Sequence, residues 1–64
     1  MNDLTDLPEK KLLRVAEAAA YFGVHEKTIR LWIDTGKLFA EKLAGSVRIP
    51  RESIAAFRLR SREN

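Results

Sequence analysis

The sequence predicts a mainly α-helical domain with three short helices and one small β-hairpin, and three observations lead to this fold class. Two short runs of apolar residues at helical spacing lie on either side of Gly23. After Gly36 the spacing changes to alternation around an Ala-Gly-Ser turn, which is typical of a β-hairpin. Pro50 then precedes a last segment in which apolar residues again recur at helical spacing.

The size and composition of the chain exclude several classes of protein. Its 64 residues make one small domain without cysteine and with a single histidine, so we expect no disulfide, metal site or cofactor. No apolar run reaches the roughly 18 to 20 residues of a membrane span. The N-terminal stretch "MNDLTDLPEKK" begins with acids rather than with the basic residues of a signal peptide. The default expectation is therefore a soluble, cytoplasmic protein.

The charge of the chain is unevenly distributed. The first nine residues contain three acids and neither lysine nor arginine, so the remaining residues carry a net charge of +6. A basic body favours an anionic partner, with nucleic acid as the leading candidate, although a solvated surface with a basic tail explains the charge equally well. We expect residues 1–11 to form a mobile acidic leader, residues 12–60 the folded domain and residues 61–64 a frayed tail.

The first helix is expected over residues 16–22. Ala18, Ala19 and Phe22 recur at helical spacing and predict its buried side, whereas Tyr21 is expected nearer the surface. The small alanines allow a second helix to approach closely. The glycine that follows can adopt the positive φ that ends a helix.

The second helix is expected over residues 26–35, with His25 at its N-cap position. Ile29, Trp32 and Ile33 predict the buried side, and we expect Trp32 to be a core anchor rather than a base-stacking residue. The residues left for the outer face are Glu26, Lys27, Thr28, Arg30, Leu31 and Asp34.

The set of residues on each face of the hairpin depends on how the two strands pair across the turn. If Leu43 faces Val47, the buried face holds Phe39, Glu41, Leu43, Val47 and Ile49. The outer, basic face then holds Ala40, Lys42, Ser46 and Arg48. The third helix follows, anchored by Ile54 and Phe57, and the last arginines, Arg58, Arg60 and Arg62, are expected on a frayed end.

Two short helices joined by a tight glycine turn are the parts of a helix-turn-helix, whose second helix enters the major groove of DNA. This arrangement explains why the second helix has a polar outer face that is nevertheless ordered, since that face is read against base edges. The hairpin is then a wing beside the DNA backbone. The expected fold is a winged helix-turn-helix, with three short helices and a two-stranded wing.

The chain resembles the excisionase-type branch of the MerR superfamily of winged-helix DNA-binding proteins. The resemblance is carried by "LLRVAEAAAYFGVHEKTIRLWIDTGKL" and by "GSVRIPRESIAAF", and it covers about residues 12–59. It implies that the second helix lies in the major groove and that a wing arginine touches phosphate or the minor groove. By position, the DNA-contacting residues would be Lys27, Thr28, Arg30, Leu31 and Arg48, with Lys42 beside Arg48 on the wing.

The sequence departs from this family at three places. Arg14 and His25 stand at the helix N-caps, where the family usually has Ser or Thr, so the caps are expected to be weaker or shifted. Ser46 stands where the family often has a second wing arginine, so the wing is expected to hold DNA less firmly. Full MerR regulators continue into a dimerisation helix and an effector domain, which we expect to be absent here.

The chemistry of the side chains indicates which role each polar residue of the second helix would have. Arg30 is the better candidate for bidentate reading of guanine, and Lys27 is the second basic contact. Glu26 can accept from a cytosine amino group, but a favourable interaction with the helix dipole is the preferred interpretation. His25 is interpreted as a cap or surface residue, because the sequence offers no second metal ligand of its type.

The leading hypothesis is sequence-specific binding of double-stranded DNA without catalysis. The resemblance favours an excisionase, a recombination directionality factor of a phage or mobile element, which bends DNA and acts with an integrase. Such a protein would be bacterial or phage-encoded, nucleoid-associated when bound, and monomeric in solution with cooperative binding on DNA. A small MerR-like transcriptional regulator is the alternative, and a protein–protein interaction module is the alternative of another class. We expect no enzyme, since no nucleophile stands with a histidine base.

Overall fold

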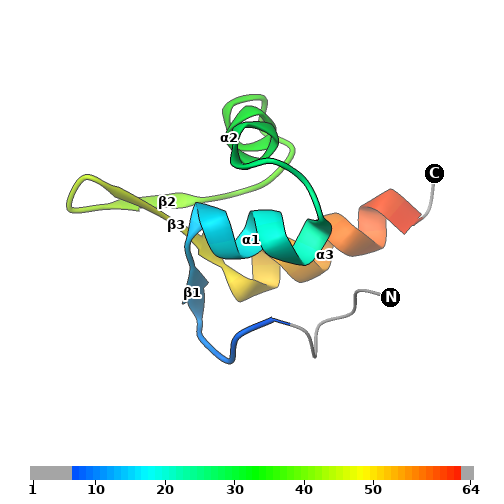
Figure 1. Cartoon of the computed structure of the whole chain (residues 1–64), viewed down its shortest axis with the longest axis horizontal. Coiled ribbons are helices and arrows are strands. Elements are labelled where there is room, and N and C mark those ends of the chain that lie inside the picture. Colours follow the sequence, from blue (N-terminus) through cyan, green and yellow to red (C-terminus); the bar gives the residue numbers. More distant parts are fainter. Residues whose placement is uncertain (1–6, 63–64) are drawn as a thin grey trace.

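A computed structural model describes residues 7–62 of the chain, and for Arg62 it describes the backbone only. In chain order, the elements are β1 (Leu12–Leu13), α1 (Val15–Phe22), α2 (Glu26–Asp34), β2 (Glu41–Leu43), β3 (Ser46–Pro50) and α3 (Arg51–Arg62). Helix α2 runs across α1, and the β2–β3 hairpin, here called the wing, projects to one side (Figure 1). The predicted fold class is confirmed, and β1 adds a third strand that sequence patterning did not reveal.

The beginning of α1 is held by a carboxylate rather than by a short polar cap. Arg14 is extended at the N-cap (φ −86°, ψ 160°), and its backbone N–H donates to Oε1 of Glu17 at 2.8 Å. The other carboxylate oxygen of Glu17 accepts from Nζ of Lys10 at 2.7 Å. The hydrogen bond from Lys10, followed by that from the Arg14 N–H, holds the pKa of Glu17 below its ordinary value of 4.5.

Replacing Glu17 with glutamine is expected to lower the free energy of unfolding by about 0.5 to 1 kcal/mol at neutral pH, because the charged cap and the ion pair are lost. A carboxyl group whose pKa is lowered in the folded state stabilises that state above its ordinary pKa. The difference from wild type should therefore shrink as the pH falls through 4.5 and below. Urea denaturation at pH 7 and pH 3.5 measures it.

The control for this experiment is Glu9→Gln, which removes an exposed carboxylate that caps no helix. The interpretation of Glu17 would be wrong if both variants lost the same stability, or if the loss at Glu17 were independent of pH.

The turn between α1 and α2 forms as predicted. Gly23 adopts a left-handed conformation (φ 71°), and its N–H donates to the carbonyl oxygen of Ala20 at 3.3 Å. The N–H of Val24 donates to the carbonyl oxygen of Ala19 at 3.0 Å, which completes the helix end. His25 caps α2, since its Nδ1 accepts from the N–H of Lys27 at 3.3 Å. The short turn therefore sets the position of α2 against α1.

The core contains the predicted side chains of all three helices, with one correction on α1. Tyr21 is only 4% exposed, whereas it was expected near the surface. Its hydroxyl oxygen accepts a hydrogen bond from Nη1 of Arg58 on α3, and this partner allows the ring to be buried. Arg58 is consequently not part of a frayed end. Its neighbour Arg60 donates to the carbonyl oxygen of Lys37 at 2.6 Å.

An aromatic cluster joins the three helices. Trp32 of α2 stacks on Phe57 of α3, with ring centroids 4.6 Å apart and planes 30° apart. Phe22 of α1 meets both rings edge-on, at 5.6 Å from Trp32 and 5.4 Å from Phe57. These are favourable geometries for aromatic side chains. Trp32 is thus a packing residue that ties α2 to α3, as predicted.

The wing has a register one residue away from the predicted one. Its turn consists of Ala44 and Gly45 alone, both with positive φ (50° and 81°), and Leu43 pairs with Ser46. A shift of one residue moves side chains to opposite faces. Leu43 is consequently 45% exposed, and Phe39, which precedes β2, is 64% exposed, so the predicted buried face is wrong for both. The unexpected feature is the positive φ of Ala44, a residue with a Cβ.

The central strand β3 pairs with β1 on one side and with β2 on the other, and both pairings are antiparallel. Part of the expected leader belongs to this folded unit. Leu7 is 3% exposed in the core, and the backbone N–H of Arg51 donates to the carbonyl oxygen of Lys11 at 2.8 Å. Residues 1–6 of the expected leader and residues 63–64 of the expected tail lie outside the described residues. Residues 61–62 of that tail continue α3.

Candidate nucleic-acid interface

The outer face of α2 presents the predicted contact residues to solvent. Lys27, Arg30 and Leu31 are exposed, and Thr28 is half-buried. Ile29 points the other way and is completely buried, which anchors the helix from beneath. The geometry of an exposed polar face on a firmly packed helix is what insertion into a DNA groove requires.

Arg30 is only loosely held in the free protein. Its Nη1 lies 3.8 Å from Oε1 of Glu26 one turn earlier, and the two side chains are 63% and 47% exposed. Exposed ion pairs of this kind contribute little free energy. Arg30 can therefore exchange this carboxylate for another acceptor at small cost. Glu26 lies in the first turn of α2, where its charge is favourable towards the helix dipole, in agreement with the preferred interpretation.

The wing places its two predicted contacts on different faces. Arg48 is half-buried and donates through Nη1 to the carbonyl oxygen of Val47 at 2.9 Å. Lys42 pairs with Val47, whereas Arg48 pairs with Glu41. Lys42 and Arg48 therefore do not share a face, contrary to prediction, because the turn has two residues instead of three.

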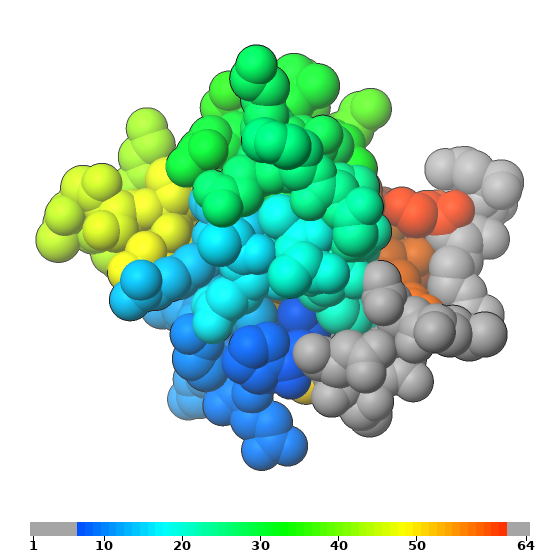
Figure 2. All heavy atoms as spheres, viewed as in Figure 1, coloured from blue at the N-terminus to red at the C-terminus, as the bar shows by residue number. Residues whose placement is uncertain are grey.

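A shallow depression connects α2 with the wing. Arg14, Arg30, Arg48, Ser46 and Glu26 are among the residues that line it, so three arginines and one acid contribute to this surface. We call this depression the arginine hollow. In the space-filling view, the segment that enters α1 lies against the wing (Figure 2). Sequence reasoning missed Arg14 as a member of this surface, because only the pairing of β1 with β3 brings it there.

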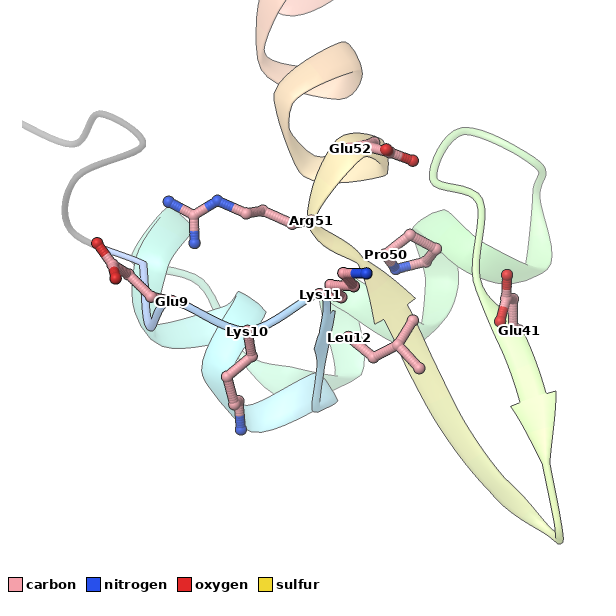
Figure 3. A pocket seen from close by; sticks show the side chains of 8 residues that line it. All are labelled: Glu9, Lys10, Lys11, Leu12, Glu41, Pro50, Arg51 and Glu52. Atoms are coloured by element: carbon pink, nitrogen blue, oxygen red, sulfur yellow. The ribbon is translucent and has the colours of Figure 1, made fainter.

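A second depression has a different electrostatic character. Its charged side chains come from the segment before β1, from β2 and from the start of α3 (Figure 3). Three cations are balanced by three carboxylates there: Lys10, Lys11 and Arg51 against Glu9, Glu41 and Glu52. A surface with equal numbers of positive and negative charges has no net attraction for a polyanion. We call this surface the balanced depression, and its residues serve as controls for those of the arginine hollow.

Within residues 7–62, no group of three His, Cys, Asp or Glu side chains could hold a metal ion. No helix in the same part of the chain is long and apolar enough to cross a membrane.

The fold and its exposed basic surface define a winged helix-turn-helix, a class of DNA-binding domain. Residues 12–62 match the family model described as a helix-turn-helix domain, and the chain belongs to this family. It is therefore a sequence-specific DNA-binding domain, of a family that typically acts without catalysis. No curated protein matches the chain significantly.

Proposed function

We propose that α2 lies in the major groove of double-stranded DNA with Lys27, Thr28, Arg30 and Leu31 towards the base edges, while Arg48 contacts the backbone. The observation that carries this proposal is the arginine hollow, which makes the outer face of α2 and the wing one basic surface. Phosphate contacts fix the position of a protein on the duplex, and groove contacts supply specificity. Lys42 adds a cation on the other face of the wing, close to its tip.

The first test is a titration of a labelled random-sequence duplex at several salt concentrations, followed by fluorescence anisotropy. The logarithm of the binding constant should fall linearly with the logarithm of the salt concentration. For Arg48→Ala, the slope should be shallower by about 0.9, the value for one phosphate contact. The matched control is Lys11→Ala, which removes one charge from the balanced depression and should leave the slope unchanged.

Two results would contradict the proposal. The first is a folded protein that does not bind duplex DNA even at low salt, which would favour the protein–protein interaction module. The second is the same slope change for Arg48→Ala and Lys11→Ala, because the wing would then contribute no contact of its own.

The proposed biological role is that of an excisionase, a phage-encoded or bacterial factor that bends DNA at repeated sites and acts with an integrase. The resemblance of residues 12–59 supports this role. A small domain contacts little DNA, so occupancy would be raised by cooperative neighbours or by the integrase. Energy transfer between dyes at the two ends of a bound site would test bending. A straight duplex would favour the small transcriptional regulator instead.

A further inference from the structure

We propose that Arg14 and Arg48 together hold one phosphate group of duplex DNA, so that the start of α1 is a third contact beside α2 and the wing. This inference rests on the proposed DNA-binding function and deepens it. It adds the N-cap residue of α1, which belongs to neither α2 nor the wing, to the DNA-binding surface.

The pairing of the strands places the two arginines side by side. In the β1–β3 ladder, Leu12 pairs with Pro50 and Leu13 with Ile49. Arg14 is the next residue and is extended, so the same register continued by one residue sets it opposite Arg48. Directly opposite residues of an antiparallel ladder project their side chains from the same face.

The two positive charges are not neutralised by a shared acid. Like charges directly opposite each other in a sheet are destabilising. Glu41 on β2 is directly opposite Arg48 and shares its face, but it lies on the side away from β1 and therefore does not stand between the arginines. Within residues 7–61, neither guanidinium group forms an ion pair with a carboxylate. An anion placed between Arg14 and Arg48 would remove their repulsion.

The nearest acid on α1 is already engaged. Glu17 contributes some attraction to Arg14, but its two oxygens accept from Nζ of Lys10 and from the backbone N–H of Arg14. In the arginine hollow, Glu26 pairs with Arg30 rather than with Arg14. Arg14 thus adds a positive charge to the residues that line the hollow.

The chemistry of the ligand follows from these groups and their location. Two planar guanidinium groups offer several N–H donors to the oxygens of a tetrahedral phosphate. The hollow lies between α2 and the wing. A helix in the major groove is flanked by the phosphates of both strands, so cations beside that helix meet the backbone and not the base edges.

The test is a double-mutant cycle with Arg14→Ser and Arg48→Ala, measured as binding to a random-sequence duplex at low salt. Serine is a favourable N-cap residue, so Arg14→Ser should remain folded, and its circular dichroism spectrum should match that of wild type. Each single variant should bind about three- to tenfold more weakly than wild type. If one phosphate is shared, the double variant should bind little more weakly than the weaker single variant.

The control is Lys11→Ser. Lys11 is close to Arg14 in sequence but lines the balanced depression and not the arginine hollow, so this variant should bind DNA like wild type. The inference would be overturned if Arg14→Ser also bound like wild type, or if the two losses multiplied in the double variant, since two separate contacts would then be present. If the folded wild-type protein did not bind DNA at all, the proposed function itself would fail, a result distinct from the other two.

Discussion

Replacing Ile29 with alanine is expected to remove a large part of the stability of the protein. Ile29 is completely buried, and no other side chain of α2 is buried to this extent. Truncating such a side chain costs about 2 to 5 kcal/mol, because apolar contacts are lost and a cavity remains. A domain of 64 residues has a total stability of only about 3 to 10 kcal/mol. The loss is therefore a large share of the total stability of the fold.

Two further variants of α2 serve as controls for the Ile29→Ala experiment. Ile29→Val removes a single methylene group and should cost about 0.5 to 1.5 kcal/mol, so the domain stays folded. Leu31→Ala changes a side chain that is 58% exposed and should leave stability almost unchanged. Chemical denaturation followed by circular dichroism measures all three. An Ile29→Ala variant no less stable than Leu31→Ala would mean that α2 is not anchored as the structure describes.

Replacing Arg30 with alanine is expected to remove most of the preference for one DNA sequence while much of the affinity for random DNA is retained. Arg30 lies on the exposed face of α2 and is loosely paired with Glu26. A bidentate contact to guanine is worth about 1 to 3 kcal/mol of discrimination, which corresponds to about 5- to 150-fold. For random DNA, the variant loses only one positive charge.

The measurement begins by selecting a preferred site from a pool of random duplexes with the wild-type protein. Affinities for that site and for a scrambled duplex are then compared for each variant. Arg30→Lys keeps the charge but lacks the planar guanidinium group that makes a bidentate contact. It should therefore bind scrambled DNA like wild type and still lose the preference for the selected site. If Arg30→Ala weakened both affinities by the same factor, Arg30 would act through charge alone.

The local features of the fold could be predicted from residue patterns. Helical spacing placed α1 and α2 within one residue of their observed ends at each terminus. The left-handed Gly23 and the cap formed by His25 were also predicted, because each depends on residues that are close in sequence. Periodicity and capping are local properties of a chain, so a sequence reports them directly.

Other features depended on contacts between distant residues. The burial of Tyr21 requires Arg58, which lies 37 residues further along the chain. The wing register depends on whether Ala44 accepts a positive φ, which its residue type disfavours and the closed hairpin imposes. In each case the deciding interaction is one that neither periodicity nor propensity encodes.

The candidate site also combines features that depend on neighbouring residues with features that depend on contacts between distant residues. The polar, basic outer face of α2 could be predicted from residue order, because apolar residues at helical spacing leave Lys27, Arg30 and Leu31 on the other side. The other cations beside that face could not be inferred from residue order, because they come from β3 and from the residue before α1. Strand pairing turned Lys42 away from Arg48 and brought Arg14 beside it, since hydrogen bonds between strands set a register that residue order leaves open.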